Sequence, residues 1–231
     1  MNIKTLGIDL AKKSFQLHGV DENGRTVFRK KVSRKELAEF VANLPLCCIA
    51  MESCATSHYW GRKFEKMGHE VRLIAAQFVK PFLINQKNDR NDAEAIVEAC
   101  LRPRMRFVAV KKTWQQDIQC LHRARQRAVR ARTVLINQTK GLFLEYGIVL
   151  DEKSDKFRNQ ALAIIEDADN ELTPALRLLL RENINEYDFV LKQSKLLEKE
   201  IKEIASQSED CKRLQEVPGV GLLGATAFVI F

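Results

Sequence analysis

The sequence lacks several features that would place it in common classes of protein. No apolar run approaches the length of about 20 residues that a membrane helix needs, and residues 1–20 do not have the layout of a signal peptide. The six cysteines form no CxxC pair, and no group of histidine and cysteine has the spacing of a zinc site. We therefore expect a cytoplasmic protein with reduced thiols and no membrane partner.

Acidic residues are almost absent from one part of the chain. Residues 101–140 contain eleven lysines and arginines and a single acid, Asp117, so this window carries +10 in a chain of net charge +8. A localised basic block favours a polyanionic partner, most often nucleic acid, and a solvated charged face is the plain alternative. The residues that we expect to contact nucleic acid are Arg102, Arg104, Lys111, Lys112, Arg123, Arg127 and Arg130.

The first hundred residues alternate between strand and helix patterns. Asn-Gly at residues 23–24 is a strong hairpin signal, and residues 33–36 form a helix capping box. The predicted strands cover residues 2–10, 13–20, 25–32, 46–51 and 70–75, and the predicted helices cover residues 33–43, 56–68, 77–85 and the run that follows Asp89. This order is typical of an α/β domain with a mixed sheet.

The second half of the chain is predicted to be helical. After an extended connector at residues 104–110, residues 113–146 form one long helix pattern, residues 157–168 a shorter one, and Pro174 can open another long helix. In that last helix, residues spaced three and four apart form a short coiled-coil seam: Tyr187, Val190, Ser194, Leu197, Ile201 and Ile204. The seam is equally consistent with a dimerisation element and with an intramolecular helical hairpin.

Four acids occupy positions from which active sites are often built. Asp9 and Glu52 lie at the ends of predicted core strands, and Asp89 and Asp92 stand three residues apart at a helix start, on one helical face. Taken alone, the two aspartates are also typical first-turn residues. Four converging carboxylates would repel one another unless cations lay between them, and such oxygen ligands suit Mg²⁺ or Mn²⁺. The pattern therefore predicts a site for two divalent ions that act on phosphodiesters.

Four motifs resemble, in the same order, those of the DEDD transposases of the insertion sequence 110 family and of the related pilin-gene invertases. They are GIDLAK at residues 7–12, MES at 51–53, KNDRNDA at 87–93 and VPGVG at 217–221. The resemblance implies an α/β RuvC-like domain of the ribonuclease-H type with a mixed sheet in residues 1–110. It further implies an all-α coiled-coil region in residues 111–212 and the start of a carboxyl-terminal transposase domain in residues 213–231.

The resemblance also implies a function. Asp9, Glu52, Asp89 and Asp92 would be the catalytic, metal-binding tetrad of a recombinase that acts on DNA under the direction of a structured guide RNA, the bridge RNA. The basic block would contact the RNA or DNA backbone, and the helical region would join the chains into a dimer or tetramer.

One departure from the family pattern limits this expectation. The family draws a nucleophilic serine from its carboxyl-terminal domain, and this chain ends shortly after residue 221. We therefore expect a truncated fragment that binds nucleic acid and metal but does not complete recombination.

Other classes of function remain open. A Holliday-junction-resolvase-like metal nuclease would use the same four acids without the serine, and a non-catalytic RNA- or DNA-binding scaffold would need only the basic helix. An actin-like sugar kinase is disfavoured, because residues 9–13 lack the glycine and threonine of its phosphate loop.

Overall fold

The computed structural model describes residues 2–83, 89–150 and 156–230 of the chain. These residues form two compact units, Met1–Lys112 and Thr113–Phe231. Each unit has its own hydrophobic core, and each is described by itself.

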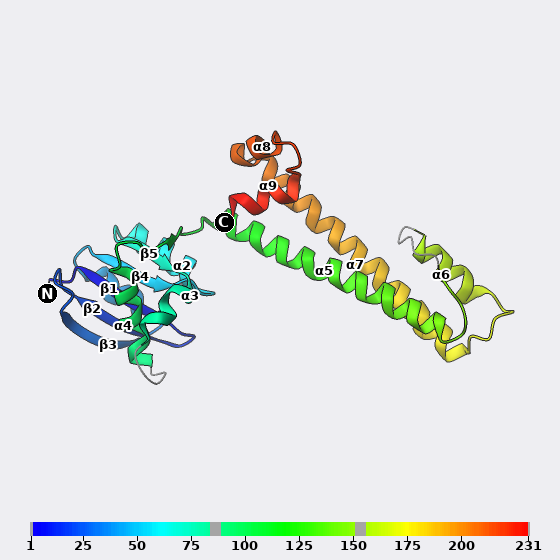
Figure 1. The fold of residues 1–231 in the computed structure, drawn as a ribbon, viewed down its shortest axis with the longest axis horizontal. Helices are drawn as coiled ribbons and strands as arrows, with labels where there is room; N and C mark the ends of the chain where they lie inside the picture. The colour runs from blue at the N-terminus through cyan, green and yellow to red at the C-terminus, as the bar shows by residue number, and fades with distance from the viewer. Residues whose placement is uncertain (1, 84–88, 151–155, 231) are drawn as a thin grey trace. The chain divides into compact units, whose positions relative to one another are not determined.

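The first unit is built on a mixed six-stranded sheet (Figure 1). Its strands are β1 (Thr5–Leu10), β2 (Ser14–Val20), β3 (Thr26–Ser33), β4 (Cys48–Glu52), β5 (Glu70–Ile74) and β6 (Phe107–Val108), in the spatial order β3-β2-β1-β4-β5-β6. Strands β1, β4 and β5 run parallel, whereas β2, β3 and β6 pair antiparallel with their neighbours. The prediction of a mixed α/β sheet is confirmed.

Helices cover both faces of this sheet. The helices of the first unit are α1 (Leu37–Ala42), α2 (Ser57–Lys66), α3 (Ala76–Val79), the 3₁₀ turn η1 (Lys80–Phe82) and α4 (Asp89–Cys100). One core cluster joins α1 and α2 to strand residues such as Ile49 and Met51, and a second joins α4 to the intervening Ala50. Successive strand residues thus face opposite layers, as the twofold repeat of a strand requires.

Helix α4 lies directly against β1. A Cβ atom on Gly7 would lie 2.5 Å from the carbonyl oxygen of Ala93 and 2.6 Å from Cγ2 of Val97, closer than atoms can approach. Only glycine leaves room for the helix backbone at this point. This contact fixes the beginning of α4 over the middle of β1.

The hairpin between β2 and β3 forms as its turn residues predict. Gly24 has a φ of 75°, and the Asp21 carboxylate accepts hydrogen bonds from the backbone amides of Asn23 and Arg25, both at 2.9 Å. The capping box also forms, since Ser33 and Glu36 exchange hydrogen bonds, but the regular helix begins only at Leu37 and β3 continues through Ser33.

The second unit is helical. Its helices are α5 (Thr113–Leu144), α6 (Phe157–Glu166), α7 (Pro174–Ser206), α8 (Glu209–Gln215) and α9 (Leu222–Val229). Helices α5 and α7 lie side by side as an antiparallel hairpin, with α6 beside them where the chain turns back (Figure 1). Tyr187 and Val190 of the predicted seam pack in one cluster with Leu135 and Phe143 of α5, so this part of the seam is used within the chain.

The end of the second unit folds back on its beginning. The hydroxyl of Thr226 in α9 lies 2.8 Å from Nε2 of His122, and the Gln115 side-chain amide donates to the carbonyl of Val229 over 2.8 Å. The VPGVG segment forms the turn before α9, and Gly219 has a φ of 87° there.

Two short elements differ from the sequence prediction. The extended connector at 104–110 contains the two-residue strand β6, which pairs with β5, and α8 was not predicted. Ser208 caps α8 by accepting a hydrogen bond from the amide of Cys211 over 3.3 Å. Among the described residues, no helix is long and apolar enough to span a bilayer.

Candidate active site

Asp9 and Glu52 lie on adjacent parallel strands. The last registered pair of β1 and β4 is Ile8 with Met51, so Asp9 and Glu52 follow one residue later on strands about 4.8 Å apart. Asp9 is two residues after Gly7 on β1, and Glu52 is two residues after Ala50 on β4. Because Gly7 and Ala50 face α4, the twofold repeat of a strand places Asp9 and Glu52 on the same side of the sheet. The strand pattern therefore brings the two carboxylates to the same layer, and each is half-buried.

Asp92 reaches the same place from the helix. It lies in the first turn of α4 and immediately precedes Ala93, whose carbonyl oxygen lies against Gly7. Its Oδ1 atom is buried and has no hydrogen-bond partner among the described residues. Burying a carboxylate oxygen without a donor is costly, and a bound cation would remove that cost.

The charges of Glu52 and Asp92 interact. Burial raises the pKa of Glu52 above its usual value, the negative charge of Asp92 raises this pKa further, and the ammonium of Lys80 opposes both effects. The structure thus brings together two of the predicted site residues from elements forty positions apart. Lys80, in η1, is a third charged neighbour that the sequence did not reveal.

Of the fourth acid, Asp89, the structure describes only the backbone. The backbone of Asp89 opens α4, but its side chain is outside the described residues, as are Lys87 and Asn88 of the same motif. Among the described residues, no group of three or more acids, histidines or cysteines is arranged to hold a metal ion. The tetrad therefore stays a prediction, with carboxylate chemistry that suits a hard divalent cation.

His58 is engaged away from the acids. Its Nδ1 accepts a hydrogen bond from the amide of Lys111 over 3.2 Å, and burial, together with the positive charges of Lys111 and Arg62, lowers its pKa. Its neutral ring therefore ties α2 to the segment that precedes α5. Nothing in these contacts assigns it to the acidic site.

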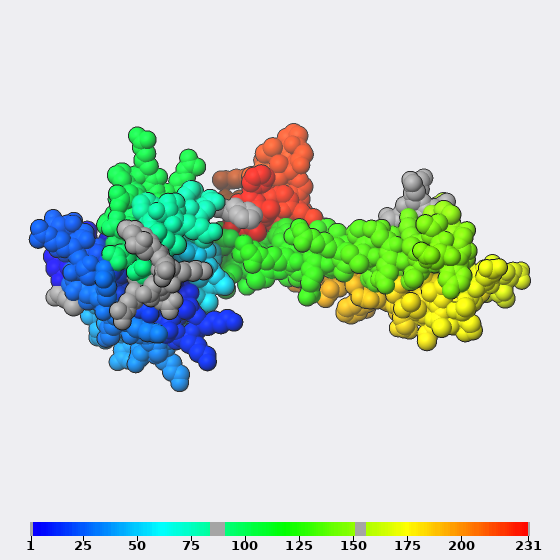
Figure 2. All heavy atoms as spheres, turned by 60° about the horizontal axis from the view of Figure 1, so that its bottom comes forward, coloured from blue at the N-terminus to red at the C-terminus, as the bar shows by residue number. Residues whose placement is uncertain are grey.

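The predicted nucleic-acid-binding residues differ in exposure. Arg123, Arg127 and Arg130 are exposed on α5, and within the described residues no ion pair engages them. The atoms of α5 cover one side of the helical hairpin in Figure 2. Lys112, Arg102 and Arg104 are also exposed, whereas Lys111 is buried. Of the neighbouring arginines, Arg125 is half-buried and bonds to Glu198 over 2.6 Å.

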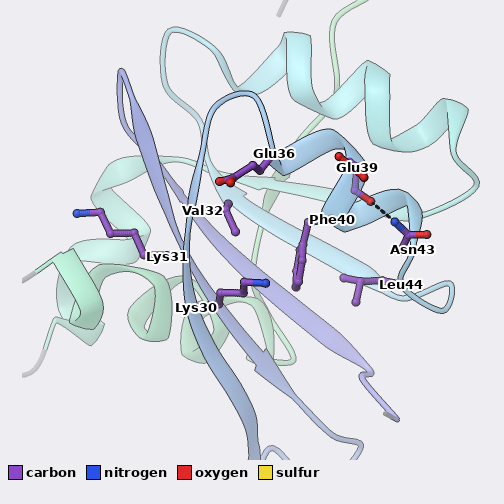
Figure 3. A pocket seen from close by; sticks show the side chains of 8 residues that line it. All are labelled: Lys30, Lys31, Val32, Glu36, Glu39, Phe40, Asn43 and Leu44. Atoms are coloured by element: carbon purple, nitrogen blue, oxygen red, sulfur yellow. Dashed lines mark hydrogen bonds between the residues drawn. The ribbon is translucent and has the colours of Figure 1, made fainter.

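A hollow of about 430 Å³ between β3 and α1 does not have the chemistry of the acidic site (Figure 3). It is lined by Lys30, Lys31, Val32, Glu36, Glu39, Phe40, Asn43 and Leu44. The Lys30 ammonium lies 4.5 Å from the centre of the Phe40 ring, and the Asn43 amide donates to the carbonyl of Glu39 over 2.9 Å. Helix α1 packs on the sheet face opposite α4, so this hollow is separate from Asp9, Glu52 and Asp92.

Comparison with known proteins identifies the family. A model of the DEDD transposases of the insertion sequence 110 type, described as "Transposase", matches residues 6–148. A probable family 20 transposase of Pseudomonas aeruginosa is 40% identical over 228 residues, which are 98% of this chain and 68% of the relative. The transposase for insertion sequence element IS1111A of Coxiella burnetii is 40% identical over 97% of this chain and 62% of its own length.

A third relative gives the same result. The transposase for insertion sequence element IS1328 of Yersinia enterocolitica is 39% identical over 97% of this chain and 66% of its own length. The chain therefore belongs to the insertion sequence 110 family of DEDD transposases, and it spans about two thirds of the length of these relatives.

The raised pKa of Glu52 predicts a pH-dependent effect of Glu52→Gln. A raised folded-state pKa means that ionisation of Glu52 at neutral pH opposes folding, and this penalty disappears as the pH falls through the folded pKa and below the ordinary value of 4.5. In metal-free buffer, Glu52→Gln should raise the melting temperature at pH 7.5 by roughly 1–2 °C and leave it unchanged near pH 4. Calorimetry with the exposed Glu22→Gln as control measures this, and an equal gain at both pH values would contradict it.

Proposed function

We propose that this chain is the metal-binding and nucleic-acid-binding part of a DNA transposase. In this proposal Asp9, Glu52, Asp89 and Asp92 hold divalent ions, Mg²⁺ or Mn²⁺, next to a DNA phosphodiester. The observation that carries the proposal is the interaction of Glu52, at the carboxyl end of a parallel strand, with Asp92, whose buried Oδ1 has no donor in the part of the chain that the structure describes. The transposase relatives supply the substrate class, which is DNA.

The proposed ions would do what carboxylates alone cannot. Two divalent ions roughly 4 Å apart can activate an attacking oxygen and stabilise the leaving oxygen of a phosphodiester. Four carboxylates around two ions form a nearly neutral centre, whereas the same carboxylates without ions repel one another and the phosphate. The negative charge of Asp92 raises the pKa of Glu52, which is the direction that repulsion between carboxylates gives.

Metal binding gives the most direct test. A ligand that binds only the folded state at a hundred times its Kd stabilises that state by about 2.7 kcal/mol, which corresponds to roughly 5–10 °C for a chain of this size. Millimolar Mg²⁺ should therefore raise the melting temperature of the parent and of Glu22→Gln, but not that of Asp92→Asn. Equal shifts in all three proteins would show that the acids do not form a cation site.

A second measurement on the same proteins, of DNA cleavage and strand exchange, distinguishes the candidate functions. Metal-dependent cleavage of branched DNA without rejoining, lost in Asp92→Asn, would favour the resolvase-like nuclease. Binding without any cleavage, unchanged in Asp92→Asn, would favour a scaffold. Strand exchange between two DNA sites would support the transposase.

We propose that the exposed arginines of α5 contact the backbone of DNA or of a guide RNA. Arg123, Arg127 and Arg130 recur at spacings of four and three residues, so they share one helical face, and all three are exposed. Guanidinium groups on such a face match a row of phosphates and do not read sequence. The same face would serve either nucleic acid.

Replacing the three arginines by glutamine should weaken the salt dependence of nucleic-acid binding. Each phosphate contact that is lost lowers the slope of log K against log salt by about 0.9 for duplex DNA, so the triple variant should lose up to roughly 2.7. The matched control replaces the exposed lysines of α7, Lys195, Lys199 and Lys202, and should retain the slope. Equal slopes for both triple variants in fluorescence anisotropy would exclude α5 as the contact surface.

We also propose that two chains associate through the outer face of α7. Leu178, Phe189 and Leu196 are 65%, 65% and 57% exposed. They are spaced eleven and seven residues apart, which places them on one side of the helix. If two copies of α7 pair antiparallel about a twofold axis near residue 187, Leu178 meets Leu196 of the second copy and the exposed Glu182 meets the exposed Lys192.

Charge exchange tests this pairing. A symmetric dimer contains two pairs of residue 182 with residue 192. Either variant, Glu182→Lys or Lys192→Glu, turns both pairs into like charges and should weaken association by about tenfold. An equimolar mixture of the two variants restores both pairs and should associate like the parent, as should the double variant. Sedimentation velocity measures this, and a mixture that stays as weak as the single variants would refute the antiparallel pairing.

A further inference from the structure

A second hollow of the first unit combines aromatic rings with arginines. It encloses about 310 Å³ and is lined by Phe78, Phe82, Arg102, Arg104, Met105 and Arg106. The phenylalanines come from α3 and η1, and the other four residues come from the segment that follows α4. A volume of this size lies at the small end of ligand pockets and suits one planar group.

One wall of this pocket is held in place. The Arg102 guanidinium lies 5.3 Å from the centre of the Phe82 ring, its side chain bonds to the Glu98 carboxylate, and its Nε donates to the carbonyl of Glu98 over 3.1 Å. Phe82 in turn packs against the core cluster that contains α4. These contacts orient a flat guanidinium and an aromatic ring before any ligand arrives.

The other wall is open and positively charged. Arg104 and Arg106 are exposed, Phe78 is 37% exposed, and residues 101–112 contain five basic residues and no acid. Glu98 neutralises the charge of Arg102 through an ion pair. A ligand in the pocket would therefore meet the positive charges of Arg104 and Arg106. The ligand that matches this wall carries a planar ring and, beside it, at least one negative group.

The pocket is connected to the acidic site by η1. This turn is three residues long and carries Lys80, whose charge acts on Glu52, and Phe82, which lines the pocket. Lys80 and Phe82 are two residues apart, so the acidic site and the pocket are both built on this one turn. A base that is still stacked in a duplex could not present its face to these rings.

We infer that this pocket holds one unpaired nucleotide of the DNA strand on which the acids act. The base stacks against Phe78 and Phe82, and Arg104 and Arg106 bind the adjacent phosphates. The inference rests on the proposed function for its choice of DNA. The pocket itself is made of residues that do not belong to the acidic site or to the basic face of α5.

The test measures binding of a fluorescent oligo-dT by anisotropy in EDTA, where no metal chemistry takes place. Phe78→Ala should raise the Kd about tenfold without changing the salt slope, and Phe78→Trp should retain the affinity of the parent. Arg104→Gln should lower the salt slope by about 0.7, the value for one phosphate contact on a single strand. Duplex DNA should bind both Phe78 variants like the parent.

Matched controls lie elsewhere on the first unit. Tyr59 is 49% exposed on α2, which packs on the opposite face of the sheet, and Arg25 is exposed in the hairpin turn. Tyr59→Ala and Arg25→Gln should leave oligo-dT binding unchanged. An equal loss in Tyr59→Ala and Phe78→Ala, or a loss in Phe78→Ala with oligo-rU but not with oligo-dT, would overturn the inference.

Two further measurements separate this inference from its premises. Photocrosslinking of the folded parent with 5-iododeoxyuridine DNA should label the peptide that contains Phe78, and labelling confined to α5 would overturn the inference without any variant. If Mg²⁺ fails to stabilise the parent while Phe78→Ala still loses oligo-dT, the metal proposal fails and the pocket stands.

Discussion

The close contact between α4 and β1 at Gly7 is the constraint on which the candidate site depends. Because residue 7 has no side chain, the helix backbone at Ala93 can lie against the strand. The first turn of the helix then places Asp92, the residue before Ala93, near the strand ends that carry Asp9 and Glu52. A larger residue at position 7 would move the whole first turn of α4 away from the sheet, and the acids would separate even though each remained in its own element.

The acids of the candidate site and the exposed arginines occupy different places in the structure. Asp9 and Glu52 are half-buried at the strand ends, where burial and the negative charge of Asp92 raise the pKa of Glu52. The exposed arginines, in contrast, lie on outer surfaces, on the face of α5 and in the segment after α4. A polyanion is attracted by such basic surfaces and repelled by carboxylates that hold no cation.

Local patterns predicted much of the first unit. Strand alternation, the Asn-Gly turn and the Ser33–Glu36 pair each depend on neighbours in sequence, so they could be read without the fold. Lys80 and the Phe82 pocket could not be predicted, because both arise only when η1 packs beside α4. Strand β6 is two residues long and exists only through its pairing with β5. Helix α8 is only seven residues long, so its signals, the Ser208 cap, two acids in the first turn and two basic residues in the last turn, fall within a very short segment.

The seam of α7 shows what periodicity cannot decide. Spacing alone gives the apolar face of a helix, but not whether its partner is the same chain or another. Tyr187 and Val190 pack against α5 of the same chain. The hydrogen bond of 3.3 Å from Asn183 to Thr139 fixes the register of the two helices. A pairing of two chains would therefore need a different face. Leu178, Phe189 and Leu196 are apolar residues on α7 that this hairpin leaves exposed, which is why any pairing of two copies is expected along that line.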